Sequence, residues 1–205
     1  MEQQPPQPND SAQEKTLGFP PTPEAGGKVP PRPARRPPHE EEAPTEVLNE
    51  RGQATAAALG RVVGSRASSS GGRDDIPWVL VMPDHLFEVL SLMKEHPETK
   101  MDMLHLLFAV DYLDHLQLIY ILASLSLNQK AMVKVDLPVA GDDAQATVDS
   151  AVALWEAAGW YERETHDLFG VRFEGNPDMS PLLLYEGFEG FPGRKSFPFN
   201  EYTEY

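Results

Sequence analysis

Residues 160–175 read WYERETHDLFGVRFEG, and this stretch is more informative than any other part of the chain. Its sixteen positions hold six charged side chains, one histidine and four aromatic side chains. A glycine such as Gly170 is typical of the position after a helix, because it adopts the left-handed backbone conformation without strain. The pattern therefore predicts a helix from Trp160 to Phe169 that ends at Gly170.

The charged residues of this expected helix are spaced as neighbours on its surface. Glu162 and His166 are four positions apart, and so are Arg163 and Asp167. Exposed pairs at this spacing contribute only about 0.2–0.5 kcal/mol each, too little to explain the charge density through stability alone. We therefore interpret the run as a contact surface beside the core, which a partner protein desolvates.

The same residue types also suit metal binding or general acid and base catalysis. A metal-dependent hydrolase using Glu162, His166 and Asp167 is therefore the alternative. Against this alternative, a metal site requires three or four converging ligands, and the two-histidine spacing of a zinc-binding helix is missing. Four other histidines are scattered among apolar or turn positions, where a structural or solvent-facing role is the better interpretation: His85, His96, His105 and His115.

Residues 74–170 alternate between strand and helix patterns. Apolar or alternating runs predict strands at 78–82, 103–110, 116–127 and 130–137. Helical spacing predicts a helix over 86–93 with Asp84 as its N-cap, and a second helix from Val148 to Ala158. Together with the helix at 160–169, this order predicts an α+β domain whose mostly antiparallel sheet has helices on one face.

The beginning of the chain has a different composition. Twelve of the twenty prolines occur by Pro44. Segments that are rich in proline and poor in apolar residues cannot bury enough surface to offset the entropy of ordering. We therefore expect residues 1–73 to be largely disordered or partner-bound, apart from a short helix around 46–63, and residues 74–170 to form the domain.

Charge and composition limit the classes of function. Residues 1–73 carry nine acidic and nine basic side chains, so residues 74–205 carry 23 acidic and eight basic ones and the entire net charge of −15. Such a domain repels nucleic acid and anionic lipid. The chain has no cysteine, which excludes disulfides, thiolate-bound clusters and thiol catalysis. Its longest apolar run, 116–127, is shorter than the roughly 20 residues of a membrane helix.

The last segment, residues 171–205, combines aromatic residues with glycine and proline. Its eight aromatic side chains follow no regular period, and its prolines prevent a regular helix or a central strand. Because so many aromatic side chains require burial, we expect an extended arm that lies on another protein. A loop that folds back on its own domain is the alternative.

These C-terminal residues resemble a known family. The run ERETHDLFGVRFEG at 162–175 is followed by Pro177-Asp178, Leu182-Leu183-Leu184, Glu189-Gly190, Pro192, Arg194-Lys195 and Phe197-Pro198. This series is similar to the signature of the 30-kDa subunit of respiratory complex I, called the C subunit of NADH-quinone oxidoreductase in bacteria. The chain departs from the family pattern at Asn176, where histidine is usual, and at Ser180 and Ser196, which are usually basic and acidic.

The resemblance implies a non-catalytic structural subunit in the hydrophilic arm of a proton-pumping NADH:quinone oxidoreductase. It implies no cofactor in this chain, with FMN, iron–sulfur clusters and quinone in partner subunits. The implied partners are the 49-kDa-type subunit (the D subunit in bacteria) and other subunits of the hydrophilic arm. The implied location is peripheral, on the cytoplasmic face of a bacterial membrane, with membrane contact only through the complex. The equivalent subunit of an energy-converting hydrogenase or formate-hydrogenlyase complex is the alternative. By position, the implied partner interface comprises Glu162, Arg163, Glu164, Asp167, Phe169, Arg172, Phe173, Arg194 and Lys195.

Overall fold

The computed structural model describes residues 47–138 and 145–198 of the chain. The α-helices in these residues are α1 (Glu50–Val63), α2 (Leu86–Glu95) and α3 (Ala158–Phe169). The strands are β1 (Ala67–Arg73), β2 (Ile76–Val81), β3 (Met103–Asp111), β4 (His115–Ser124), β5 (Gln129–Pro138), β6 (Thr147–Asp149) and β7 (Arg172–Glu174). Two short 3-10 helices, η1 (Gly64–Arg66) and η2 (Pro83–His85), follow α1 and precede α2.

Five of the strands form one sheet in the order β1-β2-β5-β4-β3. β2 and β5 are parallel, whereas the other three pairings in this sheet are antiparallel. β6 and β7 form a separate parallel pair, with Val148 opposite Phe173. The predicted α+β class with a mostly antiparallel sheet is therefore confirmed.

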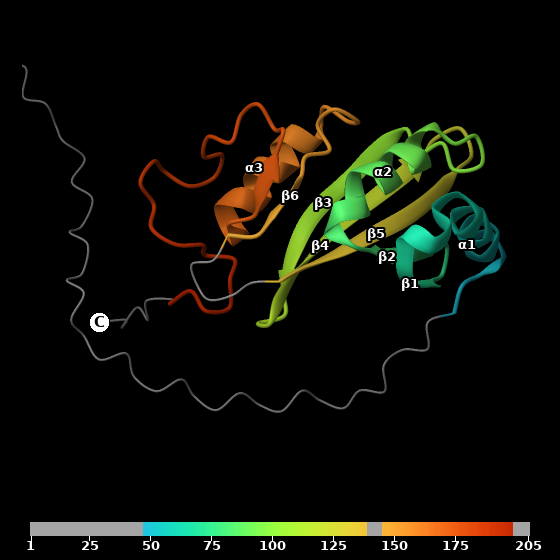
Figure 1. The fold of residues 1–205 in the computed structure, drawn as a ribbon, viewed down its shortest axis with the longest axis horizontal. Helices are drawn as coiled ribbons and strands as arrows, with labels where there is room; N and C mark the ends of the chain where they lie inside the picture. Colours follow the sequence, from blue (N-terminus) through green and yellow to red (C-terminus); the bar gives the residue numbers. More distant parts are fainter. Residues whose placement is uncertain (1–46, 139–144, 199–205) are drawn as a thin grey trace, which may run out of the picture. The chain divides into compact units, whose positions relative to one another are not determined.

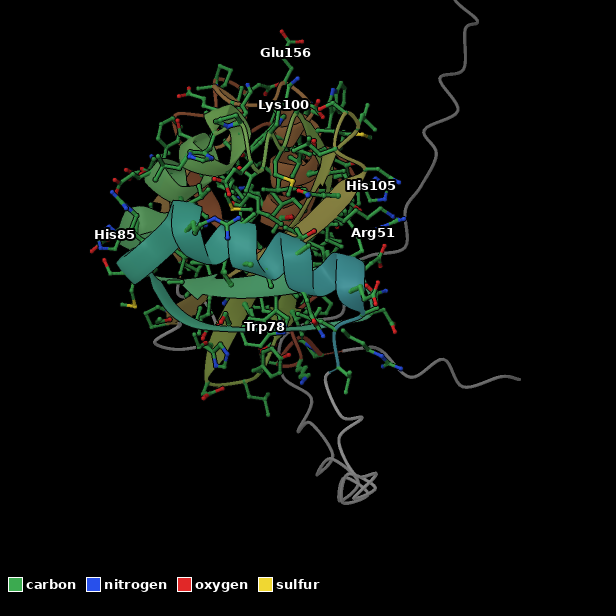
Figure 2. All side chains as sticks on the ribbon, turned by 90° about the vertical axis from the view of Figure 1, so that its right-hand side faces the viewer. Arg51, Trp78, His85, Lys100, His105 and Glu156 are labelled. Atoms are coloured by element: carbon green, nitrogen blue, oxygen red, sulfur yellow. The ribbon has the colours of Figure 1, made fainter. Side chains whose placement is uncertain are left out.

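The two faces of the sheet differ in burial. On one face, alternate residues of β5 from Ala131 to Leu137 are buried and share a core with Leu59 of α1 and Leu90 of α2. Figure 1 shows α2 lying along the sheet, with α1 beside it and α3 beyond β3. The other face carries partly exposed side chains such as Trp78, which Figure 2 places on the side of the strands away from α1. Within the described residues, the helices thus cover one face, as predicted.

The folded part of the chain begins earlier than the composition indicated. The helix expected around 46–63 is confirmed by α1, which buries Leu59 and Val63 in the core. The domain boundary at residue 73 is wrong, because β1 pairs with β2 along Ala67–Arg73. The sequence of β1, ASSSGGR, has no alternation of apolar residues, and backbone pairing with β2 holds it extended. Our prediction for residues 1–46 lies outside the described residues.

The helix expected from Val148 to Ala158 is wrong. Val148 lies in β6, and turns connect this strand to α3, which begins at Ala158. The backbone N–H of Ala151 donates to the Glu162 carboxylate (2.7 Å), so a tertiary hydrogen bond replaces a helical one. A burial-dependent contact of this kind leaves no periodic signal in the sequence.

The other expected elements are found close to their predicted positions. β2, β3, β4 and β5 correspond to the four predicted strands, although β4 ends at Ser124 and the chain turns before β5. α2 corresponds to the predicted helix at 86–93, but Asp84 lies in η2 and α2 has no side-chain cap. In the described ranges, no helix has both the length and the apolar character needed to cross a membrane.

Candidate functional site

Helix α3 is held at its C-terminal end by a glycine and an aromatic ring. Gly170 has the left-handed conformation (φ 71°), and its N–H donates to the His166 carbonyl (2.8 Å), as the sequence predicted. A Cβ at this position would lie 2.5 Å from the ring of Phe191, so glycine is also required by packing. The chain beyond β7 therefore returns to the end of α3.

Glu162 is fully buried and connects three segments of the chain. One carboxylate oxygen accepts from the N–H of Ala151 (2.7 Å), and the other accepts from the Ser150 hydroxyl (2.8 Å) and the Asn176 side-chain amide (2.8 Å). Burial raises the pKa of Glu162, and these three hydrogen bonds oppose the rise. The carboxylate thereby ties α3 to the turn after β6 and to the residue that follows Gly175.

We define the arm as residues 175–198. Asp167, which is 6% exposed, binds it at its middle. One oxygen of this carboxylate accepts three successive backbone N–H groups, those of Leu182, Leu183 and Leu184, at 2.8, 2.7 and 3.2 Å. Charge-assisted bonds from adjacent amides resemble those of an anion bound in a backbone nest. Asp167 therefore fixes the path of the arm over α3.

Arg163 binds the arm one turn earlier on the same helix. Its guanidinium donates to the carbonyls of Ser180 (2.9 Å) and Pro181 (3.2 Å) and to the Ser180 hydroxyl (3.1 Å). It also lies 3.5 Å from the Asp178 carboxylate and stacks over the ring of Trp160. In the described residues, the sequence-neighbour pairs Glu162–His166 and Arg163–Asp167 form no salt bridge.

The second half of the arm also packs on its own domain. Buried Arg194 donates through Nε to the Phe169 carbonyl (2.8 Å) and stacks over Phe191. The N–H of Lys195 donates to the Asp111 carboxylate at the end of β3 (2.6 Å). Residues 175–198 therefore fold back on their own domain, as the alternative expected, and the contact of this arm with another protein stays a prediction. The aromatic residues at 199, 202 and 205 lie outside the described part of the chain.

The nine residues implied as a partner interface separate into two groups. Glu162, Asp167, Phe173 and Arg194 are buried, and Arg163 and Phe169 are partly buried. Only three are exposed: Glu164, Arg172 and Lys195. The structure thus brings most of the motif together inside the chain, as bonds between α3 and the arm.

Sequence reasoning missed the most exposed apolar residues near this motif. Trp160, at the start of the predicted helix, is 62% exposed. Leu183 and Tyr185 of the arm are 58% and 68% exposed. We call these three side chains, together with Glu164, the α3–arm surface. The helical spacing of apolar residues does not by itself distinguish these exposed side chains from core side chains. The arm packs on a different side of α3 and leaves them exposed.

The three residues of the hydrolase alternative do not converge. Glu162 binds Ser150, Asp167 binds the arm, and Nδ1 of His166 lies 2.9 Å from the Val171 carbonyl. Over the described ranges, no three histidine or acidic side chains come together as metal ligands. The arrangement gives the hydrolase alternative no support.

Comparisons with known proteins bear on the same region. The family model of the "Respiratory-chain NADH dehydrogenase, 30 Kd subunit" matches residues 79–203. The C 2 subunit of NADH-quinone oxidoreductase from Rhizobium meliloti is 33% identical over 144 residues, which are 69% of this chain and 76% of that protein. The corresponding C subunit from Methylobacillus flagellatus is 38% identical over 122 residues, 55% of this chain and 60% of that protein.

A solved structure is also similar. It is a chain of the membrane-bound sulfane sulfur reductase, an archaeal respiratory membrane complex. The TM-score is 0.61 with 29% sequence identity, over 73% of this chain and 86% of that chain. The domain described above therefore recurs in a respiratory membrane assembly of a different name.

Proposed function

Since the chain belongs to the family of 30 Kd subunits of respiratory-chain NADH dehydrogenase, we propose that it is a non-catalytic structural subunit of a proton-pumping NADH:quinone oxidoreductase. It lies in the hydrophilic arm, on the cytoplasmic face of a bacterial membrane, and braces the 49-kDa-type subunit that receives the quinone. FMN, iron–sulfur clusters and quinone belong to the partner subunits.

One observation carries this proposal: the charges of α3 are used inside the chain to fasten the arm. Glu162, Arg163 and Asp167 each bond to residues between 150 and 184. Glu162 and Asp167 serve in these contacts as hydrogen-bond acceptors for other parts of the chain. They produce an ordered surface, because the arm has several fixed points along its length. Ordering before contact reduces the entropy lost on binding.

The α3–arm surface has the composition of a protein contact. Trp160 and Tyr185 are aromatic and exposed, and aromatic side chains are enriched at the centres of protein interfaces. Leu183, whose N–H donates to the Asp167 carboxylate, precedes Tyr185 by two residues. We therefore assign the contact with the 49-kDa-type subunit to this surface, with Glu164 at its rim.

The open face of the sheet is a second surface for partners. In the described chain no helix covers it, and many of its side chains are apolar, although Arg73, Lys130, Lys134 and Asp136 on this face are charged. Lys134 stacks over Trp78 near its centre (4.2 Å to the ring). An apolar face of this kind marks an interaction site. Its main apolar members are Trp78, Leu80, Met103, Leu106, Phe108, Ile121 and Met132.

We expect the double variant Trp160→Ala/Tyr185→Ala to fold normally and to lose most of the assembled complex. Both side chains are mainly exposed, and each makes one ring contact, with Arg163 and with Phe188, so their removal should change the free energy of unfolding by only about 1 kcal/mol each. Aromatic residues central to an interface contribute about 2 kcal/mol or more. The measurements are the thermal midpoint of the isolated chain, and complex yield with NADH:quinone reductase activity in membranes. The matched control is Tyr112→Ala, a tyrosine 48% exposed in the β3–β4 turn. Wild-type assembly of the double variant contradicts the assignment.

The fold alone does not separate complex I from a related assembly, because a similar domain occurs in an archaeal respiratory membrane complex. Purification through this chain distinguishes them. Complex I predicts co-purification of a flavin-carrying NADH module. A nickel–iron catalytic subunit in its place indicates the equivalent subunit of an energy-converting hydrogenase.

A further inference from the structure

The strands β3 and β4 are apolar on both of their faces. On the face that no described helix covers, β4 presents Ile119, Ile121 and Ala123, and its inward residues from 116 to 122 are Leu or Tyr. An antiparallel strand with one solvated face alternates between apolar and polar residues, whereas a strand buried on both faces is apolar almost throughout. The composition of β3 and β4 is therefore that of strands covered on both sides.

The neighbouring strand β5 keeps the alternating pattern. Its inward residues are buried, while Lys130, Lys134 and Asp136 lie on the open face. The apolar surface over β3 and β4 therefore has a charged border at β5. We call this surface the β3–β4 strip and define it by six outward residues: Met103, Leu106, Phe108, Ile119, Ile121 and Ala123.

The pairing register arranges the strip and its border in rows. The three cross-strand pairs of the strip are Met103–Ala123, Leu106–Ile121 and Phe108–Ile119. On β5, Lys130 is the neighbour of Ala123, and Lys134 is the neighbour of Ile119. The two lysines are four residues apart, which is about 14 Å along an antiparallel strand. They therefore lie at the two ends of the strip, on the same side of it.

The two lysines form no ion pair within the described part of the chain. Lys134 instead stacks over the ring of Trp78, which Figure 2 places on the side away from α1. The acidic residue of the border is already bonded, because Asp136 accepts from the Gln117 amide (2.7 Å) and lies 3.7 Å from Nε2 of His115. The border thus presents positive charge, although residues 74–205 are acidic overall.

We propose that one α-helix of a partner subunit lies along the β3–β4 strip, with carboxylate side chains facing Lys130 and Lys134. The inference rests on the proposed role of this chain as a subunit of an assembly. A helix is about 10 Å wide, which suits two strands that are about 4.8 Å apart. The opposite face of the same sheet is already covered by helices, α1 and α2, which share a core with alternate residues of β5.

The dimensions of the strip define the sequence of this helix. Its three rows span about 14 Å, which corresponds to about ten helical residues. Apolar residues at positions i, i+3 or i+4, and i+7 would face the strip. Two acidic residues seven positions apart lie on one flank of a helix and about 11 Å from each other, within reach of both lysine side chains.

A second copy of this chain suits the strip less well. Each copy would bring the same pair of lysines and the same excess of acidic residues, 23 against eight basic ones in residues 74–205. Like charges oppose association. The same acidic excess opposes an anionic membrane surface, which attracts basic segments.

Photo-cross-linking in the assembled complex, purified through this chain, tests the inference. A photoreactive residue in place of Leu106 is expected to capture one segment of another subunit, identified by mass spectrometry of the joined peptides. That segment should have helical apolar spacing and two carboxylates about two turns apart. The matched control position is Phe87 of α2, which has the same exposure as Leu106, 37%, and should not capture this segment.

Charge variants test the border. Lys130→Glu/Lys134→Glu is expected to lower the yield of the cross-link from position 106 by roughly fivefold or more. Lys130→Arg/Lys134→Arg keeps the positive charge and should retain a yield near that of the wild type. The thermal midpoint of each isolated variant shows whether it is folded.

Three results would overturn the inference. They are capture of peptides of this chain itself, which indicates a second copy, capture of lipid alone, which indicates a membrane, and an unchanged yield in the folded glutamate variant. In each case the partner subunits still co-purify, so the proposed function stands. If no other subunit co-purifies, the proposed function fails and this inference fails with it.

Discussion

Replacing Asp167 with alanine is expected to destabilise the protein by about 3 kcal/mol and to release the arm from α3. The carboxylate is buried and accepts the N–H groups of Leu182–Leu184, so its loss leaves three backbone donors without a charged acceptor. Chemical denaturation measures the free energy of unfolding, and limited proteolysis measures release, through faster cleavage between 175 and 198.

Glu164→Ala is the matched control for this variant. Glu164 is an exposed acidic residue on the same helix, so its removal should change the free energy of unfolding by less than about 0.5 kcal/mol and leave cleavage of the arm unchanged. Equal stability and equal cleavage in Asp167→Ala and wild type would contradict the anchoring role of Asp167.

Replacing Glu162 with alanine is expected to destabilise the protein by about 3–4 kcal/mol. The variant leaves the Ala151 N–H, the Ser150 hydroxyl and the Asn176 amide without their acceptor in a buried position, and it opens a cavity beside α3. The free energy of unfolding and hydrogen exchange of the Ala151 amide measure this effect. A loss below about 1 kcal/mol would show that water replaces the carboxylate at little cost.

Glu162→Gln is expected to shift the dependence of stability on pH. Burial raises the pKa of Glu162 above its ordinary value of 4.5, so the folded protein binds this proton more tightly than the unfolded chain. The contribution of this proton to the free energy of unfolding is fully present below the pKa that Glu162 has in the unfolded chain. It is lost as pH rises through the pKa that Glu162 has in the folded protein. As pH rises from below 4.5 through the folded pKa, the variant should therefore gain stability relative to wild type. A constant difference between the two, or one of opposite sign, contradicts the raised pKa.

Much of the sheet could be predicted from sequence, because its residues are alternately apolar or continuously apolar. The runs at 103–110 and 130–137 became β3 and β5, and Gly170 correctly marked the end of α3. β1 could not be predicted, because a Ser/Gly-rich segment becomes a strand only through pairing with β2. The helical spacing of residues 150–157 was similarly misleading. The Ala151 N–H bonds to the Glu162 carboxylate, and this segment forms turns in place of a helix.

The charged motif could be identified from sequence, but the contacts that its side chains make could not. Spacing on a helix shows which charges are neighbours, and it favoured pairs such as Arg163–Asp167. The structure directs both side chains to the arm instead, at Ser180 and at Leu182–Leu184. These contacts join residues more than a dozen positions apart through turns that carry no periodic signal. The outward-facing residues, Trp160 and Tyr185, could be recognised only once the path of the arm was known.

The central claim is that the internal bonds of α3 order the arm into a surface for the quinone-site subunit. Photo-cross-linking from position 185 in the assembled complex tests it most directly. A photoreactive residue replacing Tyr185 is predicted to capture the 49-kDa-type subunit, whereas the same residue at Tyr112 captures little of it. Cross-linking to that subunit from position 112 and none from position 185 would contradict the account.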